Sequence, residues 1–250
     1  MYYKTKLACH NFTMYDLTTH NVVCYFWHEG EGELGANSFA SCVCAYILNE
    51  LGDTDHVTIY SDGCTYQNRN VTLANALLHV SVTSNKTILQ KILEKGHTQM
   101  ECDSIHSTIE RSLRDKAIYS PSNYVEAIES ARQVNPYKVK YLDHSFFVNY
   151  SEVQYYSSIR PGVRVGDPCV THIRVLKYTP DGKIEYKLMY DEEFQELPRR
   201  SRRQEPRVVT SQLYSCPVNI KKSKYKHLQE LKKVMPKDYH GLYDALPHSD

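Results

Sequence analysis

Residues 56–70 read HVTIYSDGCTYQNRN, and this stretch decides the fold that we predict. Its first six residues form a short apolar and β-branched run, which is typical of a buried strand, and Asp62-Gly63 ends that run. The residues from Asn68 to Ser81 have the pattern of a helix. The sequence therefore predicts a strand, a loop and a helix in this order, with a carboxylate in the loop.

Strand and helix patterns alternate on both sides of this stretch. Before it, two β-prone runs are separated by a polar turn, and a run with helical spacing ends at Gly52. The expected elements are a hairpin of residues 3–16 and 22–28, a helix over 35–51, a strand over 87–95 and a helix over 101–116. This order is typical of a mixed α/β fold.

The helix over residues 101–116 has one apolar and one polar side. Consecutive side chains are turned by about 100° around a helix axis, so residues three or four positions apart share a face. We expect Ile105, Ile109 and Leu113 to be buried, and Asp103, Ser107 and Glu110 to be exposed or to line a polar cleft.

The second part of the chain is less regular. It contains a helix over 121–132, an aromatic and irregular stretch over 134–156, and a hairpin around the turn Thr179-Pro180-Asp181-Gly182. A linker rich in proline and arginine over 197–207 precedes a lysine-rich helix over 221–234. We divide the chain into a core over 1–116, a helical and hairpin extension over 117–196, and a basic linker with a C-terminal helix over 197–250.

Charge is distributed unevenly although the net charge of the 250 residues is only +1. Residues 1–150 carry a net charge of −4, whereas residues 151–250 carry +5. Between Arg199 and Lys237 there are 12 lysines and arginines and only two acidic residues. Such a run attracts polyanions or serves as a nuclear import signal, and the alternative is a solvated, mobile charge run.

The sequence also indicates a compartment. We see no secretory signal and no apolar stretch long enough to span a membrane, so we expect no membrane partner. The eight cysteines do not have the density of a disulfide-rich secreted scaffold, and we interpret them as free thiols in a reducing compartment. Together with the basic run, this predicts a nuclear location, with the cytoplasm as the alternative.

Carboxylates at the ends of the predicted elements suggest a metal centre. Asp62 follows a strand, and Glu101 and Asp103 begin a helix, with Glu110 as a further ligand on it. Mg²⁺ and Mn²⁺ prefer carboxylate oxygens, and two such ions support phosphodiester chemistry. The alternatives are a turn with a helix cap at Asp62 and acids that simply complement the helix dipole.

Polar and cationic side chains near these carboxylates suggest contacts with nucleic acid. They are suited to hydrogen bonds and ion pairs with phosphates, and the histidine could also transfer protons. A structural histidine is the alternative reading at that position. The candidates are Gln67, Asn68, Arg69 and His97, together with Arg199, Arg200, Arg202 and Arg203 of the linker.

Two motifs together resemble a known family. They are SDGCTYQNRN at residues 61–70 and GHTQMECDSIHSTIE at residues 96–110, and Trp27-His28-Glu29 supports them. The chain resembles a family of uncharacterised transposon-derived proteins of animal genomes with ribonuclease H-like, DDE-transposase-type domains. The resemblance implies a mixed sheet flanked by helices, DNA as the partner and two-metal chemistry with Mg²⁺ or Mn²⁺ at Asp62 and Asp103.

One departure from the family's pattern bears on activity. The resemblance implies a first strand, with an essential carboxylate, before the segment that begins at Tyr2, and we expect this chain to lack that strand. Asp16 is the nearby substitute, although it lies in the predicted hairpin turn, where Asp is common. We therefore expect little metal-dependent nuclease or strand-transfer activity. The alternative function is a non-catalytic, domesticated module that binds nucleic acid or another protein.

Overall fold

The computed structural model describes residues 4–94, 96, 99–200 and 208–249. The chain forms two compact units, and each is built from separated segments. Unit 1 comprises Met1–Leu34, Met100–Phe147 and Leu213–Asp250, and unit 2 comprises Gly35–Gln99 and Val148–Gln212. Each of the three segments expected from the sequence contributes to both units.

Unit 1 contains a sheet with the strand order β1-β2-β5. Its strands are β1 (Cys9–Tyr15), β2 (Val22–His28) and β5 (Lys138–Tyr141). The antiparallel pairing of β1 and β2 confirms the predicted hairpin, whereas β5 adds in parallel to β2 from the stretch that we expected to be irregular. Every residue of β2 is buried, because this strand lies in the middle of the sheet.

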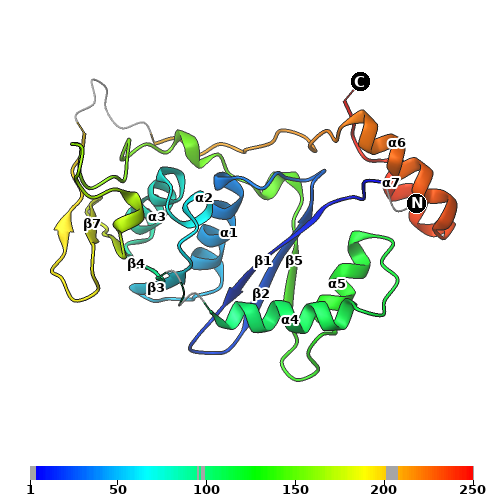
Figure 1. Cartoon of the computed structure of the whole chain (residues 1–250), viewed down its shortest axis with the longest axis horizontal. Coiled ribbons are helices and arrows are strands. Elements are labelled where there is room, and N and C mark those ends of the chain that lie inside the picture. Colours follow the sequence, from blue (N-terminus) through cyan, green and yellow to red (C-terminus); the bar gives the residue numbers. More distant parts are fainter. Residues whose placement is uncertain (1–3, 95, 97–98, 201–207, 250) are drawn as a thin grey trace. The chain divides into compact units, whose positions relative to one another are not determined.

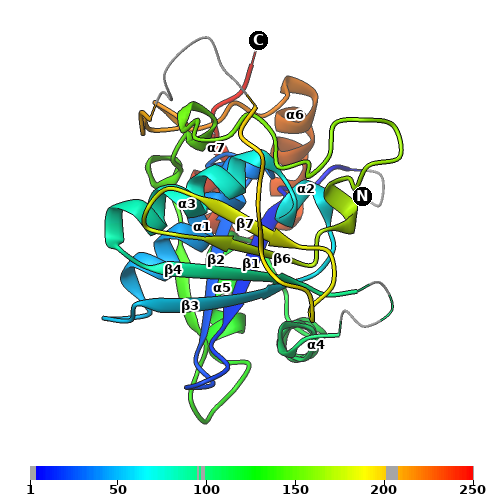
Figure 2. The ribbon, with the colours of Figure 1, turned by 90° about the vertical axis from the view of Figure 1, so that its left-hand side faces the viewer.

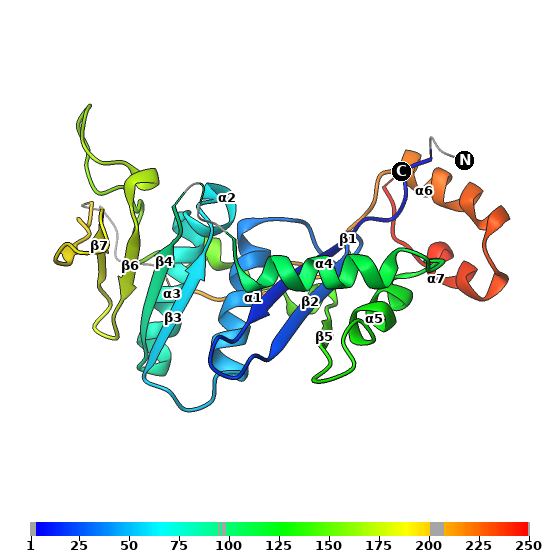
Figure 3. The same cartoon turned by 60° about the horizontal axis from the view of Figure 1, so that its bottom comes forward.

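Helices α4 (Glu101–Leu113) and α5 (Pro121–Glu129) pack against one side of this sheet (Figure 3). Ile105 and Ile109 of α4 are buried, Leu113 is half-buried, and Asp103 and Glu110 are exposed. These burials confirm the predicted orientation of α4. Their apolar partners include Cys24 and Phe26 of β2 and Ile128 of α5.

The C-terminal helices of unit 1 have a small core of their own. They are α6 (Lys222–Leu231) and α7 (His240–Asp244), and short 3₁₀ turns cover His144–Phe146, Lys232–Val234 and Lys237–Tyr239. Leu228, Leu231 and Tyr243 form the centre of this core. The predicted lysine-rich helix is thus confirmed, and an ion pair of 2.5 Å between Lys224 and Glu29 connects it to the end of β2.

Unit 2 contains a second mixed sheet with the strand order β3-β4-β6-β7-β8 (Figures 1 and 2). Its strands are β3 (His56–Ser61), β4 (Thr87–Ile92), β6 (Val175–Tyr178), β7 (Ile184–Lys187) and β8 (Gln195–Glu196). β3 and β4 are parallel, whereas the later strands are antiparallel. The β6–β7 pairing confirms the hairpin that we predicted around Thr179–Gly182.

Helix α3 (Val71–Ser84) connects β3 to β4, and it packs against α1 (Ala36–Asn49). Between β3 and α3 lies one further helical turn, α2 (Thr65–Asn68). Short 3₁₀ turns cover Tyr150–Glu152 and Val170–His172. Leu77 and Leu78 of α3 and Ile88 of β4 are completely buried and belong to the core of this unit.

Two expectations for this region were wrong. β3 is not buried throughout, because it lies at one end of the sheet: Val57 and Ser61 are buried, whereas His56, Thr58 and Tyr60 are exposed. The helix does not begin at Asn68 but at Val71, because Asn70 caps it by accepting a hydrogen bond from the Leu73 amide at 2.8 Å. Both units nevertheless have the mixed α/β architecture that the sequence predicts.

Candidate functional site

The pairing in unit 2 brings the loop after β3 and the start of β6 to one end of the sheet. Ser61 is aligned with Ile92, the last residue of β4, because these two strands are parallel. The Ile92 amide in turn donates to the carbonyl of Arg174, directly before β6, at 2.8 Å. Asp62 and Arg174 therefore follow or precede strands at the same sheet end, although they lie far apart in the sequence.

Asp62 is half-buried, and one of its oxygens organises the loop. Its Oδ1 accepts hydrogen bonds from the Cys64 amide at 3.1 Å and from the side-chain amide of Asn68 at 2.6 Å. This is the turn and cap arrangement that we considered as the alternative to a metal ligand. A carboxylate has room for further partners at its other oxygen, so the two roles are compatible.

The residues after Asp62 serve the loop as well. The Asn68 carbonyl accepts from the side chain of Gln90 at 2.6 Å, and Gln90 accepts from the Tyr178 hydroxyl at 2.8 Å. The Gln67 carbonyl accepts from the Asn70 side chain at 3.1 Å, and the Gln67 side chain is half-buried. The side-chain amide of Asn68 is thus directed at Asp62. The contacts with nucleic acid that we predicted for Asn68 and Gln67 stay predictions.

Arg69 is buried, with 7% of its surface exposed. Its Nη1 donates to the Thr171 carbonyl at 2.6 Å, so the guanidinium connects the loop after β3 to the 3₁₀ turn before β6. A Cβ placed on Gly63 would lie 3.1 Å from Arg69 Nη2, so glycine lets the backbone approach the guanidinium closely. The burial of Arg69 was not foreseen from the sequence.

The predicted acidic residues of α4 are all exposed and belong to unit 1. Asp103 Oδ2 accepts from the Met100 amide at 2.8 Å, and this helix-capping contact agrees with the alternative reading of the first-turn acids. Glu101 and Asp103 are two positions apart and so point to different sides of the helix, whereas Glu110 shares a side with Asp103 two turns later.

A shared metal site therefore stays a prediction, because Asp62 belongs to unit 2 and the α4 carboxylates belong to unit 1. Within the described residues, no group of three or more His, Cys, Asp or Glu side chains is arranged to hold a metal ion. The expected approach of Asp62 and Asp103 to within ~8 Å likewise stays a prediction.

The predicted basic residues are described in part. Arg199 and Arg200 are exposed; the Arg199 guanidinium lies 5.1 Å from the centre of the Tyr156 ring and donates to the Gly182 carbonyl. Arg200 donates to the Gly162 carbonyl at 3.4 Å. His97, Arg202 and Arg203 lie outside the described residues.

Sequence reasoning missed Arg174 and Thr171. Arg174 Nη1 donates to the Thr171 carbonyl at 3.3 Å, the same acceptor that Arg69 uses, and its Nε contacts Glu94 at 3.1 Å. These two residues precede a hairpin and carry no local motif. Only the antiparallel pairing of β6 with β4 reveals their place beside Arg69.

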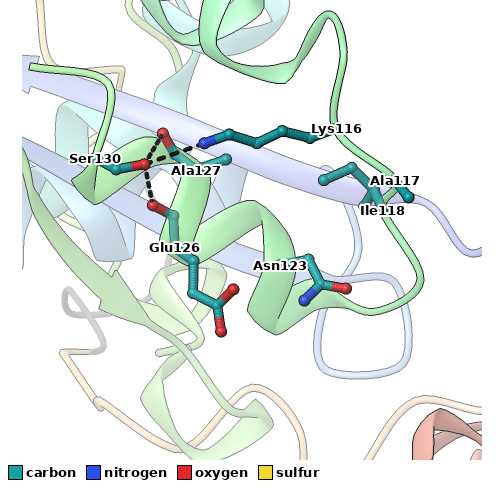
Figure 4. A pocket seen from close by; sticks show the side chains of 7 residues that line it. All are labelled: Lys116, Ala117, Ile118, Asn123, Glu126, Ala127 and Ser130. Atoms are coloured by element: carbon teal, nitrogen blue, oxygen red, sulfur yellow. Dashed lines mark hydrogen bonds between the residues drawn. The ribbon is translucent and has the colours of Figure 1, made fainter.

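A hollow of about 420 Å³ lies elsewhere, in unit 1 (Figure 4). Its polar wall includes Lys116, which donates to the hydroxyls of Ser112 and Ser130, at 3.2 Å in each case. No predicted site residue lines it, so it is not the candidate site. The lining residues are Lys116, Ala117, Ile118, Asn123, Glu126, Ala127 and Ser130.

No helix in the described part of the chain is both long and apolar enough to cross a membrane. All eight cysteines are present as free thiols. No protein-family model, curated protein or solved structure matches the chain.

Proposed function

We propose that this protein binds nucleic acid, with DNA as the expected partner, and belongs to the transposase or nuclease type with a ribonuclease H-like fold. The observation that carries the proposal is the loop after β3 at the end of the unit 2 sheet, which holds both the Asp62 carboxylate and a buried guanidinium, that of Arg69, and in which the two charges interact. A carboxylate that can hold Mg²⁺ or Mn²⁺ beside a cation that can hold a phosphate is what phosphodiester chemistry requires.

The order of the elements supports the ribonuclease H-like part of this proposal. An antiparallel hairpin, a helix and then two parallel strands joined by a helix follow one another along the chain. β1 and β3 each lie at one end of the strand order of their sheet. In the ribonuclease H-like arrangement, the equivalents of these two strands would flank the first strand.

Asp62, Asp103 and Glu101 are the proposed catalytic and metal-binding residues, with Glu110 as an additional ligand. Oδ1 of Asp62 is already engaged by two hydrogen bonds from its own loop, which limits how this carboxylate can hold two ions. Even a small displacement of the attacking oxygen can cost ~100-fold in rate. We therefore propose that the protein binds DNA in the nucleus and cleaves it slowly.

One observation favours a second candidate, a binding module without catalysis. Oδ1 of Asp62 already accepts two hydrogen bonds from its own loop, which gives this carboxylate a purely structural use. In that case the basic linker would bind nucleic acid, and no metal ion would bring about cleavage.

Binding and cleavage assays on labelled single-stranded and duplex DNA test both candidates. We expect binding that weakens as salt rises, and slow cleavage that depends on Mg²⁺ or Mn²⁺. Asp62→Asn keeps the hydrogen-bond acceptor of the loop but removes its charge, and it should abolish the cleavage. Asp55→Asn, at an exposed position before the same strand, is the matched control.

The possible results distinguish the two candidate functions. DNA binding without cleavage in the presence of any metal ion would exclude the nuclease and support the non-catalytic binding module. Affinity that does not change with salt would contradict both candidates. Robust cleavage that Asp62→Asn abolishes would contradict the proposed impairment.

A further inference from the structure

Two arginines of unit 2 converge on one carbonyl oxygen. Arg69 Nη1 and Arg174 Nη1 donate to the Thr171 carbonyl, at 2.6 Å and 3.3 Å. Two guanidinium groups that share one neutral acceptor repel each other, and burial together with the charge of Arg174 lowers the pKa of Arg69. A negative charge at this place would relieve the repulsion.

Arg69 also has a buried donor without an acceptor. Its Nε is inaccessible to solvent and has no hydrogen-bond partner among the described residues. The residue as a whole is only 7% exposed, so water has little access to this donor. Buried polar atoms nearly always have a partner in folded proteins, and an unpaired one is often explained by an ion or ligand. The guanidinium is therefore incompletely satisfied by the protein alone.

Acidic neighbours balance part of the positive charge of this pair. Two carboxylates lie nearby: Asp62 acts on Arg69, and Glu94 is paired with Arg174 at 3.1 Å. Glu94 is about half exposed, so it can move away from Arg174 at little cost.

We propose that Arg69 and Arg174 form a binding site for a backbone phosphate of nucleic acid, next to Asp62. The planar guanidinium fork matches the geometry of phosphate oxygens. A side chain at position 63 would crowd this fork, because a Cβ on Gly63 would lie 3.1 Å from Arg69 Nη2. In this site Glu94 is a competitor that occupies Arg174 when no phosphate is bound. The proposal rests on the proposed function, which it extends to a defined phosphate contact.

Opposite changes in two variants test the role of Arg174. Arg174→Gln should weaken binding of a single-stranded oligonucleotide about tenfold, because it removes a charge-assisted contact. It should also reduce the slope of log affinity against log salt by ~0.7, the value for one phosphate contact with a single strand. Glu94→Gln breaks the same ion pair but frees Arg174, so it should strengthen binding by at least about twofold.

A matched pair on the neighbouring strands serves as the control. Lys177 of β6 and Glu185 of β7 form an ion pair of 2.7 Å, and Lys177→Gln and Glu185→Gln should leave the salt slope unchanged. If the Arg174–Glu94 pair only stabilised the fold, Arg174→Gln and Glu94→Gln would change affinity in the same direction and leave the slope alone. That result would overturn the proposal.

Arg69 is tested conservatively, because its truncation can unfold the loop. Arg69→Lys keeps the charge but loses the fork, and it should weaken oligonucleotide binding about tenfold while thermal unfolding confirms that the protein stays folded. Unchanged affinity in the folded Arg69→Lys protein would overturn the proposal.

Inorganic pyrophosphate separates this inference from the proposed function. At matched ionic strength it should raise the melting temperature of the native protein and have less effect on Arg174→Gln. If pyrophosphate stabilised the protein in this way but no oligonucleotide bound, the phosphate site would be supported and the proposed function contradicted. If Arg174→Gln bound the oligonucleotide with the native affinity and the native salt slope, the proposed function would stand and the phosphate site would be contradicted.

Discussion

The thiol of Cys169 has an environment that favours its ionised form. Its Sγ lies 3.1 Å from the Thr171 hydroxyl and 3.5 Å from His172 Nδ1. The hydrogen bond from Thr171 lowers the pKa of Cys169, whereas burial raises the pKa of Cys44 to about 12. Because the thiolate is the reactive form, we expect iodoacetamide to alkylate Cys169 well before Cys44 at neutral pH, as measured by peptide mass mapping.

An exposed cysteine and one substitution provide the reference for this prediction. Cys216 is exposed and gives the rate of an accessible thiol. Thr171→Val removes the hydroxyl but keeps the backbone carbonyl, so the rate at Cys169 should fall toward that of Cys216. A rate that stays the same in Thr171→Val would show that the hydroxyl does not stabilise the thiolate.

At the scale of the elements, the packing of α4 makes a clear energetic prediction. Ile109 is 6% exposed and belongs to the core formed with β2 and α5. Ile109→Ala should therefore lower the free energy of unfolding by about 2–5 kcal/mol, from lost burial and the cavity left behind. Urea unfolding followed by circular dichroism measures this change.

The adjacent residue is the control for α4. Glu110 is exposed on the same helix, so Glu110→Ala should change the free energy of unfolding by no more than ~0.5 kcal/mol. Equal losses in Ile109→Ala and Glu110→Ala would mean that α4 does not bury the face that carries Ile109.

Elements with a strong local pattern were predictable from the sequence. The β1–β2 hairpin consists of two β-prone runs around a polar turn, and α1 and α4 have helical apolar spacing. For β4 the pattern alone allows a strand or a helix, and the shortness of the run before Gly96 favours the strand. β5 was missed because its sequence, Lys138–Tyr141, has only four residues, and it is defined by pairing with distant β2. The start of α3 was misplaced because the cap at Asn70 outweighs the helical pattern of the residues before it.

The same distinction applies to the candidate site. Asp62 and Arg69 stand out because they lie in one short motif after a strand. Arg174 could not be found in this way, because its position beside Arg69 results from the pairing of β4 with β6. The sequence also could not reveal that Asn68 would use its amide on Asp62.

For the molecule as a whole, one buried and two half-buried histidines set a dependence of stability on pH. Burial lowers the pKa of His10 and His28 in unit 1 and of His79 in unit 2 below the ordinary value of 6.5. The unfolded chain therefore binds more protons than the folded protein at mildly acidic pH. Stability should be complete above about pH 6.5 and should be lost progressively as the pH falls from there through the folded-state pKa values.

Urea unfolding at about pH 7.5 and about pH 5.5 checks this dependence. We expect a lower midpoint at the acidic pH. His28→Gln should reduce the difference between the two pH values, because Gln does not titrate in place of a side chain that is 4% exposed. A difference that is unchanged in His28→Gln would assign the effect to the other histidines, and an equal midpoint at both pH values would contradict the prediction.

The interleaving of the two units has a consequence for how the chain acquires its structure on the ribosome. Unit 2 gains its last segment with Gln212, and unit 1 needs the segment from Leu213 onward, so the first unit to begin is the last to finish. Until β5 emerges, one edge of β2 has no parallel neighbour for its backbone hydrogen bonds, and Tyr25 and Trp27 lack the rings of Phe146 and Phe147 that pack against them in the folded protein. Pairings this distant in sequence slow folding, so nascent chains of this protein depend on chaperones for longer than a contiguous domain of similar size would.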